Sequence, residues 1–216
     1  MSLASPADDA AARMDRMYRH QRFVYDLTRR WYLLGRDRLL DRLAAELPQG
    51  ASLCEVGCGT ARNLIRLARR RPDLRLCGLD ASTAMLATAR AALARRGLAG
   101  RIFLRQGLAA ELDGGPFDAV LFSYALSMMP GWRRAVDRAR TQLAPSGLVA
   151  AVDFADGRGL PRWFRHGLHR WLAMFAVRPN LQLVPFFQSL VAAEGGELRA
   201  RPIFGRYALL LTYRTA

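Results

Sequence analysis

The chain has 216 residues, with 33 basic and 18 acidic side chains, a formal net charge of +15 and no lysine. This length suits one globular core, and no apolar run reaches the ~20 residues that a membrane-spanning helix needs, so we expect no transmembrane segment. Residues 1–15 are rich in alanine and aspartate and lack a hydrophobic run, so we expect no secretory signal. The positive charge favours an anionic partner, either a nucleic acid or an anionic membrane surface.

Residues 1–50 are predicted to form an N-terminal helical segment. The helical pattern runs over residues 13–47, has a break near Leu34-Gly35 and ends at Pro48-Gln49-Gly50. This segment precedes the first predicted strand, so we expect it to act as a helical lid or substrate-binding segment.

Residues 51–216 are predicted to form one α/β domain, because strands and helices alternate as in a parallel sheet with helices on both faces. The predicted strands are 51–56, 74–79, 101–105, 117–123 and 148–154, and the predicted helices are 60–71, 82–96 and 131–143. The last of these helices is expected to stop at Ala144-Pro145-Ser146-Gly147. Two tail strands, Glu197–Ile203 and Tyr207–Tyr213, are joined by three residues and should pair antiparallel.

The three cysteines, Cys54, Cys58 and Cys77, lie in or beside predicted buried strands. An odd number of cysteines in such places indicates reduced thiols in a cytoplasmic protein. Cys54 and Cys58 suggest a metal-binding pair, but no third and fourth ligands lie near them in the sequence. We therefore expect them to pack in the core, and we expect no metal site.

The most informative stretch is Glu55-Val56-Gly57-Cys58-Gly59-Thr60, where the first predicted strand meets the first predicted helix. Its two glycines let the backbone turn tightly and approach a ligand at a helix N-terminus. Asp80 ends the second predicted strand, the place where an acid holds the ribose in βαβ nucleotide sites. The combination predicts a nucleoside cofactor.

Residue types around this loop distinguish two classes of cofactor. A dinucleotide fingerprint needs a third small residue at the position of Arg62, which disfavours NAD and FAD. The pattern Glu-x-Gly-x-Gly, with Asp80 lying 21 residues after Gly59, resembles the S-adenosylmethionine loop of class I methyltransferases. This resemblance implies a Rossmann-like, mostly parallel seven-stranded sheet with one antiparallel C-terminal strand.

The same resemblance implies the contacts of the cofactor. Glu55 and the two glycines would surround its methionine part, and Asp80 would bind the ribose hydroxyls, with Ala81 near the adenine. An acid usually follows the third strand, but here Gln106 stands, which can bond the adenine amine through its carbonyl oxygen. The predicted cofactor-binding residues are Arg36, Glu55, Gly57, Cys58, Gly59, Asp80, Ala81, Gln106, Gly107, Leu108 and Ser123.

The end of the fourth predicted strand, Ser123-Tyr124-Ala125-Leu126-Ser127-Met128, is where such enzymes bring donor and acceptor together. Enzymes that methylate amines on nucleic-acid bases usually carry Asn/Asp-Pro-Pro-Tyr/Phe at this place. The different sequence here argues against a nucleic-acid substrate or partner.

Two further segments concern the acceptor. Tyr18, Tyr25 and Tyr32 are seven residues apart and share one face of a continuous helix, either packed on the sheet or facing a cationic amine from a lid. Residues 160–175 repeat aromatic residues and leucines at spacings of three and four among arginines and histidines. Such a helix suits an anionic membrane surface. The alternative is that it packs on the sheet. Both interpretations can apply to the same helix if one face packs on the core and another contacts lipid. His166 and His169 are expected on its surface and not as metal ligands.

Four segments resemble the betaine-lipid N-methyltransferases, in a match that runs from about Arg13 to Tyr213; they are residues 25–37, 123–130, 152–156 and 160–164. The resemblance implies three methylations of diacylglycerylhomoserine, giving diacylglyceryl-N,N,N-trimethylhomoserine, by an enzyme peripheral to the inner face of the cell membrane. Phosphatidylethanolamine or small-amine methylation is the enzyme alternative. A basic lipid- or nucleic-acid-binding module with a vestigial cofactor loop is the non-enzyme alternative, against which the intact loop and Asp80 speak.

The amine must lose its proton before each transfer, and Tyr25, Tyr32 or Asp153 could assist that step. An aromatic wall would tolerate the amine at every stage of methylation, and arginines would hold the lipid carboxylate. The predicted substrate-binding residues are Tyr18, Arg29, Arg30, Tyr124 and Trp163. Arg36 could bind either the lipid carboxylate or that of the cofactor.

Overall fold

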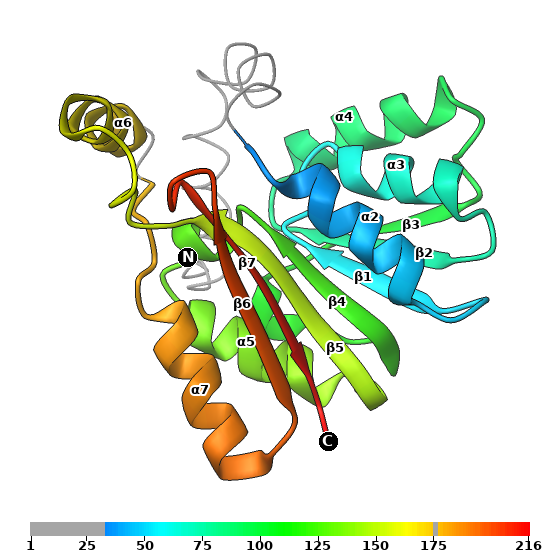
Figure 1. Ribbon diagram of the computed structural model, residues 1–216. Coiled ribbons are helices and arrows are strands. Elements are labelled where there is room, and N and C mark those ends of the chain that lie inside the picture. Colours follow the sequence, from blue (N-terminus) through cyan, green and yellow to red (C-terminus); the bar gives the residue numbers. More distant parts are fainter. Residues whose placement is uncertain (1–32, 175–176) are drawn as a thin grey trace, which may run out of the picture.

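The computed structural model describes residues 33–174 and 177–216. Seven strands form one sheet in the order β3-β2-β1-β4-β5-β7-β6 (Figure 1). Their bounds are β1 Ser52–Val56, β2 Arg75–Asp80, β3 Ile102–Gln106, β4 Phe117–Ser123, β5 Leu143–Phe154, β6 Glu197–Ile203 and β7 Ala208–Arg214. The pairings among β1 to β5 are parallel, and β7 pairs antiparallel with both β5 and β6. The predicted seven-stranded sheet with one reversed strand is confirmed.

Helices cover both faces of this sheet, and the central strands are therefore buried on both sides. The helices are α2 Arg36–Glu46, α3 Arg62–Arg70, α4 Thr83–Ala94, α5 Trp132–Thr141, α6 Arg162–Met174 and α7 Leu183–Glu194, with short 3₁₀ turns η1 Ala109–Glu111 and η2 Leu126–Met128. Along β4, Ala119 and Leu121 face the core under α2, α3 and α4, whereas Val120 and Phe122 face the core under α5 and α7. Figure 1 shows α2 in front of the sheet and α5 behind it.

Two elements differ from the sequence expectations. β5 begins at Leu143 and runs through the predicted turn 144–147, because Leu143 pairs with Phe117 before a register shift. Ser146, with φ 57°, takes up the irregularity. Helix α7 was not predicted, since its sequence is apolar almost throughout and has no polar face to reveal a helical period.

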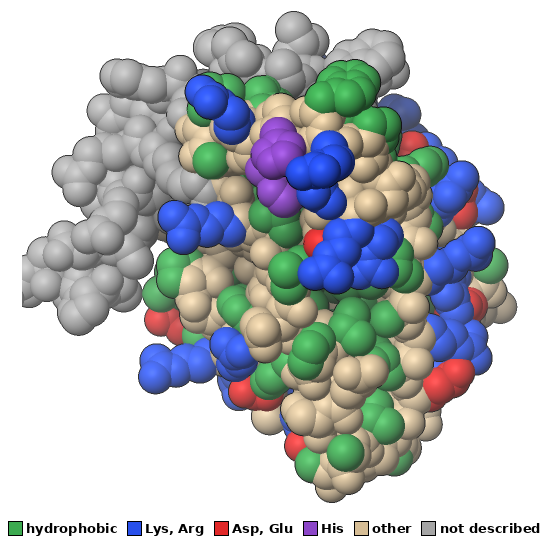
Figure 2. All heavy atoms as spheres, turned by 60° about the vertical axis from the view of Figure 1, so that its left-hand side comes forward, with side chains coloured by type: hydrophobic (Ala, Val, Ile, Leu, Met, Phe, Trp, Pro, Cys, Tyr) green, Lys and Arg blue, Asp and Glu red, His purple; other side chains and the backbone are tan. Residues whose placement is uncertain are grey.

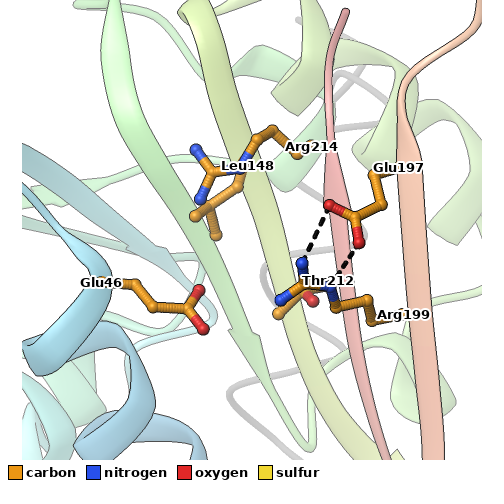
Figure 3. Close-up of a pocket in the computed structure, with 6 residues that line it drawn as sticks. All are labelled: Glu46, Leu148, Glu197, Arg199, Thr212 and Arg214. Atoms are coloured by element: carbon orange, nitrogen blue, oxygen red, sulfur yellow. Dashed lines mark hydrogen bonds and ion pairs between the residues drawn. The ribbon is translucent and has the colours of Figure 1, made fainter.

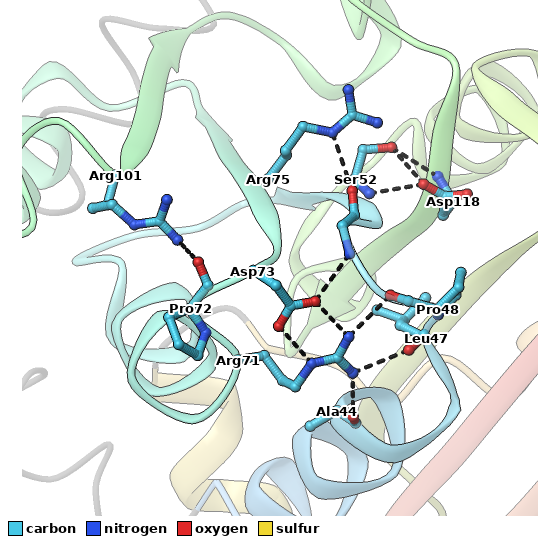
Figure 4. A network of polar contacts seen from close by, with 11 residues as sticks. Ala44, Leu47, Pro48, Ser52, Arg71, Pro72, Asp73, Arg75, Arg101 and Asp118 are labelled. Atoms are coloured by element: carbon cyan, nitrogen blue, oxygen red, sulfur yellow. Dashed lines mark hydrogen bonds and ion pairs between the residues drawn. The ribbon is translucent and has the colours of Figure 1, made fainter.

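Helix α2 belongs to the same core as the sheet. Its Leu39, Leu40 and Leu43 are buried with the residues of α3. Arg71 holds its C-terminal end, because its guanidinium donates to the carbonyls of Ala44 (2.6 Å) and Leu47 (3.0 Å) and binds a neighbouring carboxylate, that of Asp73 (Figure 4). These bonds satisfy carbonyls that end a helix without partners, and they fix α2 against the start of the sheet.

Candidate functional site

The carboxyl ends of β1 to β5 meet at one edge of the sheet, where open α/β sheets bind their ligands. The loop that follows β1 carries the two predicted glycines, Gly57 with φ 74° and Gly59 with φ 53°. The N–H groups of Gly57 and Cys58 donate to the carbonyl of Leu79, at 2.7 Å and 3.1 Å. The loop therefore folds across the end of β2.

Close packing surrounds this glycine loop. A Cβ on Gly57 would lie 2.9 Å from the Cβ of Ala125, in the loop after β4, so the two loops touch here. A Cβ on Gly78 of β2 would lie 2.8 Å from both Cys58 Sγ and Leu64 Cδ1. In dinucleotide sites, a third glycine in the loop lets the helix approach the strand closely. Here Gly78 of β2 allows that close approach instead.

Asp80 lies against this loop, as the sequence predicted. Its Oδ2 accepts from the Gly59 N–H at 2.7 Å, and its Oδ1 accepts from the Ser82 N–H at 2.9 Å. Ser82 caps α4 with its side chain and orders the turn after β2. The carboxylate is therefore held at the end of β2, partly exposed and beside the glycine loop.

Glu55 is buried beneath the loop, where its Oε1 accepts from the Asn63 Nδ2 at 2.6 Å. Sequence reasoning missed Asn63, although a polar residue on the inner face of the predicted helix 60–71 was a signal of this role. Asn63 is itself buried in the first turn of α3. The pair ties the acid of the loop motif to the helix that follows it.

The residues predicted near the adenine lie beyond Asp80, after β2 and β3. The Gln106 side chain is exposed and its amide nitrogen is 3.5 Å from the Ala81 carbonyl. The Gly107 N–H donates to the Asp80 carbonyl at 3.1 Å, and Leu108 N–H donates to the Glu111 carboxylate at 3.3 Å. The structure thus brings these residues to the same edge of the sheet.

The end of β4 carries a buried hydroxyl and a buried ring. Ser123 Oγ has no hydrogen-bond partner within the described part of the chain. Tyr124 is 2% exposed, has φ 54°, and donates from its hydroxyl to the Leu34 carbonyl at 2.5 Å. Burial raises the pKa of this hydroxyl well above its ordinary value. Tyr124 therefore lies beneath the residues that precede α2, and its contact with an acceptor stays a prediction.

Asp153 is the next-to-last residue of β5 and is 1% exposed. Its Oδ2 accepts from the Ser127 N–H at 2.9 Å and its Oδ1 from the Phe154 N–H at 2.8 Å. Burial raises the pKa of Asp153 to about 6, although the hydrogen bonds from Ser127 and Phe154 oppose this rise. This geometry suits a residue that anchors the loop after β4, and its part in proton transfer stays a prediction.

Of the other predicted site residues, the structure describes Arg36 and Trp163. Arg36 is buried at the start of α2, and its Nε donates to the Leu33 carbonyl at 3.2 Å. Trp163 of α6 is 76% exposed. The remaining predictions lie outside the described residues, and they are Tyr18, Tyr25, Arg29, Arg30 and Tyr32.

The three cysteines lie in or beside β1 and β2. Cys54, Cys58 and Cys77 are free thiols, and burial raises the pKa of Cys58. Across residues 33–174 and 177–216, no three His, Cys, Asp or Glu side chains are grouped as a metal site. In the same ranges, no helix has the length and apolar character needed to cross a membrane.

A surface pocket lies away from this edge, near the opposite end of β5, where Glu46, Leu148 and Arg214 contribute to it (Figure 3). Its arginines already have partners, because Arg199 bonds Glu197 (2.5 Å) and Arg214 donates to the Ser146 carbonyl (2.8 Å). The pocket is therefore not part of the candidate site.

The features at the carboxyl edge fit S-adenosylmethionine. Gly57 lets the loop after β1 pack closely on the loop after β4, Asp80 offers carboxylate oxygens to a ribose, and Ser123 offers a buried hydroxyl that lacks a partner in the described structure. Glu55 and Asn63 hold the loop from below.

Comparisons with known proteins agree with this assignment. Residues 54–149 match a family model described as a methyltransferase domain. The carboxy-S-adenosyl-L-methionine synthase of Campylobacter concisus is 41% identical over 93 residues, which cover 43% of this chain and 39% of that protein. The trans-aconitate 2-methyltransferase of Deinococcus radiodurans is 33% identical over 139 residues, which cover 64% of this chain and 48% of that protein. The chain thus spans less than half the length of either relative.

Among solved structures, an O-methyltransferase family protein from Burkholderia thailandensis superimposes with a TM-score of 0.67. The match covers 94% of this chain and 63% of that one, at 20% sequence identity. At this identity the likeness bears on the fold, which is the one expected from the glycine loop and the strand order.

Proposed function

We propose that the chain is a class I methyltransferase with S-adenosylmethionine as its cofactor, and that it methylates a lipid amine. The acceptor we propose is diacylglycerylhomoserine, which three transfers convert into diacylglyceryl-N,N,N-trimethylhomoserine. The observation that carries the cofactor assignment is the contact of Asp80 Oδ2 with Gly59 N–H, because it joins the predicted ribose acid to the glycine loop.

The acceptor rests on the four segments that resemble betaine-lipid N-methyltransferases. The first three are distant in the sequence, yet their described parts adjoin one another. Tyr124 bonds the Leu34 carbonyl, and Asp153 bonds the Ser127 N–H. Such convergence at the carboxyl edge supports one shared acceptor site next to the cofactor.

The reaction would break the bond between sulfur and the methyl group as the bond between nitrogen and methyl forms, and the sulfonium charge would be lost. The amine must reach the site without its proton, which passes to a base or to water. Alignment of amine, methyl and sulfur can supply ~7–11 kcal/mol of the barrier reduction. The ordered loop after β4, anchored by Asp153, suits such alignment.

A second candidate function follows from the relative that acts on trans-aconitate, a tricarboxylate. A net charge of +15 favours an anionic small molecule as well as an anionic lipid surface. The cofactor site would be the same in both cases, and the acceptor alone would differ.

Methyl transfer from labelled S-adenosylmethionine distinguishes these acceptors. We expect label in diacylglycerylhomoserine dispersed in mixed micelles, ending in the trimethylated product, and no label in phosphatidylethanolamine or trans-aconitate. Asp80→Ala is the control for the cofactor site, because loss of the ribose acid should lower transfer to every acceptor alike when S-adenosylmethionine is limiting. Label in phosphatidylethanolamine alone, or in trans-aconitate alone, would refute the proposed substrate while leaving the methyltransferase assignment intact.

A further inference from the structure

Helix α6 has one side in the core and another in solvent. Leu172 is buried, and Leu168 and Trp171 pack against the same hydrophobic cluster. Trp163 and Met174 are 76% and 67% exposed. The helix is therefore anchored on the domain by its buried side, and it exposes a large apolar side chain near each of its two ends.

The turn between β6 and β7 extends this surface. Its residues 204–206 pair with the segment that leads into α6, because the Gly157 N–H donates to the Arg206 carbonyl (2.8 Å) and the Gly159 N–H donates to the Gly205 carbonyl (3.0 Å). A Cβ on either Gly159 or Gly205 would lie about 3 Å from the backbone of the other, so the two segments touch. The turn and the start of α6 are thus held together as one surface.

The tip of that turn is also apolar and flanked by charge. Phe204 is 42% exposed, and the guanidinium of Arg38 lies 4.6 Å from its ring centre. Arg206 forms a two-pronged bond to Asp156, at 2.6 Å and 2.8 Å. Phe204 therefore stands at an exposed turn, with the guanidinium of Arg38 over its ring and Arg206 two residues further along the chain.

We define the docking face as the exposed side of α6 together with the turn 204–206 and the segment 157–160 that joins them. Beside it lie Arg38 of α2, over the Phe204 ring, and one acid, Asp156, which pairs with two arginines of the face. The arginines of the face itself are Arg158, Arg162, Arg165, Arg170 and Arg206. Figure 2 shows arginine and histidine side chains gathered over the upper part of this side of the molecule, with hydrophobic side chains among them. The arginines are attracted to anionic lipid head groups, and the exposed aromatic rings can insert at the boundary between head groups and acyl chains.

We propose that the docking face binds an anionic phospholipid membrane. The segment 157–160 begins three residues after Phe154, the last residue of β5, so a membrane held there would bring lipid head groups to the edge of the sheet that carries the cofactor site. In naming a lipid surface the proposal rests on the proposed function. Vesicle binding needs neither cofactor nor acceptor, however, so it can fail or succeed independently of methyl transfer.

Co-sedimentation with vesicles tests the proposal on the full chain. We expect binding to equimolar phosphatidylglycerol–phosphatidylcholine vesicles and much weaker binding to phosphatidylcholine alone. Phe204→Asn should lower binding about tenfold, because asparagine keeps the positive φ of 51° at this turn and removes the ring. Trp163→Ser should act similarly, and Arg158→Gln should lower binding about fivefold.

The matched control is Phe103→Ser. Phe103 is 68% exposed on β3, the opposite edge strand of the sheet, so it should leave vesicle binding within about twofold of the wild type. Circular dichroism of each variant confirms that its fold is retained. Equal binding to neutral and anionic vesicles, or equal losses for Phe103→Ser and Phe204→Asn, would overturn the proposal. So would a dimer that Phe204→Asn converts to monomer without any change in vesicle binding, because the face would then join two copies of the chain.

Discussion

Replacement of Gly57 by alanine should lower the affinity for S-adenosylmethionine about tenfold or more, because it displaces the glycine loop of the candidate cofactor site. The new Cβ would stand 2.9 Å from the Cβ of Ala125 and 3.3 Å from Met129 Cε, so the two loops must move apart. Titration calorimetry with S-adenosylmethionine measures the loss directly.

Gly97→Ala provides the matched control for this prediction. Gly97 also has a positive φ, 67° against 74° for Gly57, but a Cβ there would meet nothing within 4 Å. Both variants carry the backbone strain of alanine in the left-handed region, about 1–2 kcal/mol. Only Gly57→Ala should weaken cofactor binding, and equal affinities in the two variants would show that the crowding at Gly57 has no part in the site.

Replacement of Asp153 by asparagine should change how stability depends on pH. Because burial raises the pKa of Asp153 to about 6 in the folded chain, the folded chain keeps this proton where the unfolded chain, with an ordinary pKa of 3.8, has released it. The free energy of unfolding is therefore highest, as far as this group is concerned, below about pH 4. It falls by about 3 kcal/mol as the pH rises through about 6. Relative to Asp153→Asn, the wild type should lose that amount over this range in urea unfolding.

Asp118→Asn serves as a control of opposite sign. Asp118 accepts from the Ser52 N–H (2.7 Å) and hydroxyl (2.8 Å), and these bonds lower its pKa. Its contribution to stability is present at neutral pH and is lost as the pH falls through its folded pKa. A wild type and an Asp153→Asn variant whose stabilities run parallel from pH 4 to pH 7 would show that the buried carboxyl does not titrate near 6.

The sheet and the cofactor residues were predictable because local patterns encode them. Phe117–Ser123 is a short, mostly apolar run between a Gly-Pro turn and the next predicted loop, and it forms β4 with those bounds. Gly57, Gly59 and Asp80 follow strands that run parallel, so their positions along the chain imply that they meet at one edge. The contact of Asp80 with Gly59 confirms that geometry.

Other features depend on partners far away in the sequence, and no local pattern reveals them. The bond from Tyr124 to the Leu34 carbonyl joins residues 90 positions apart, and it holds the tyrosine ring in a buried position that no local pattern indicates. Trp163 and Trp171 have the same residue type on one helix, yet the first is exposed and the second packs on the core. The difference arises from how α6 sits on the domain, which its helical period alone does not determine.

Calorimetric titration of the wild type with S-adenosylmethionine, and separately with NAD, tests the central claim most directly. The site predicts one molecule of S-adenosylmethionine bound per chain and no heat with NAD. Asp80→Ala should weaken the binding about tenfold to a hundredfold, since it removes charged hydrogen bonds to the ribose. Binding of NAD in place of S-adenosylmethionine, or no heat with S-adenosylmethionine in a folded protein, would contradict the account.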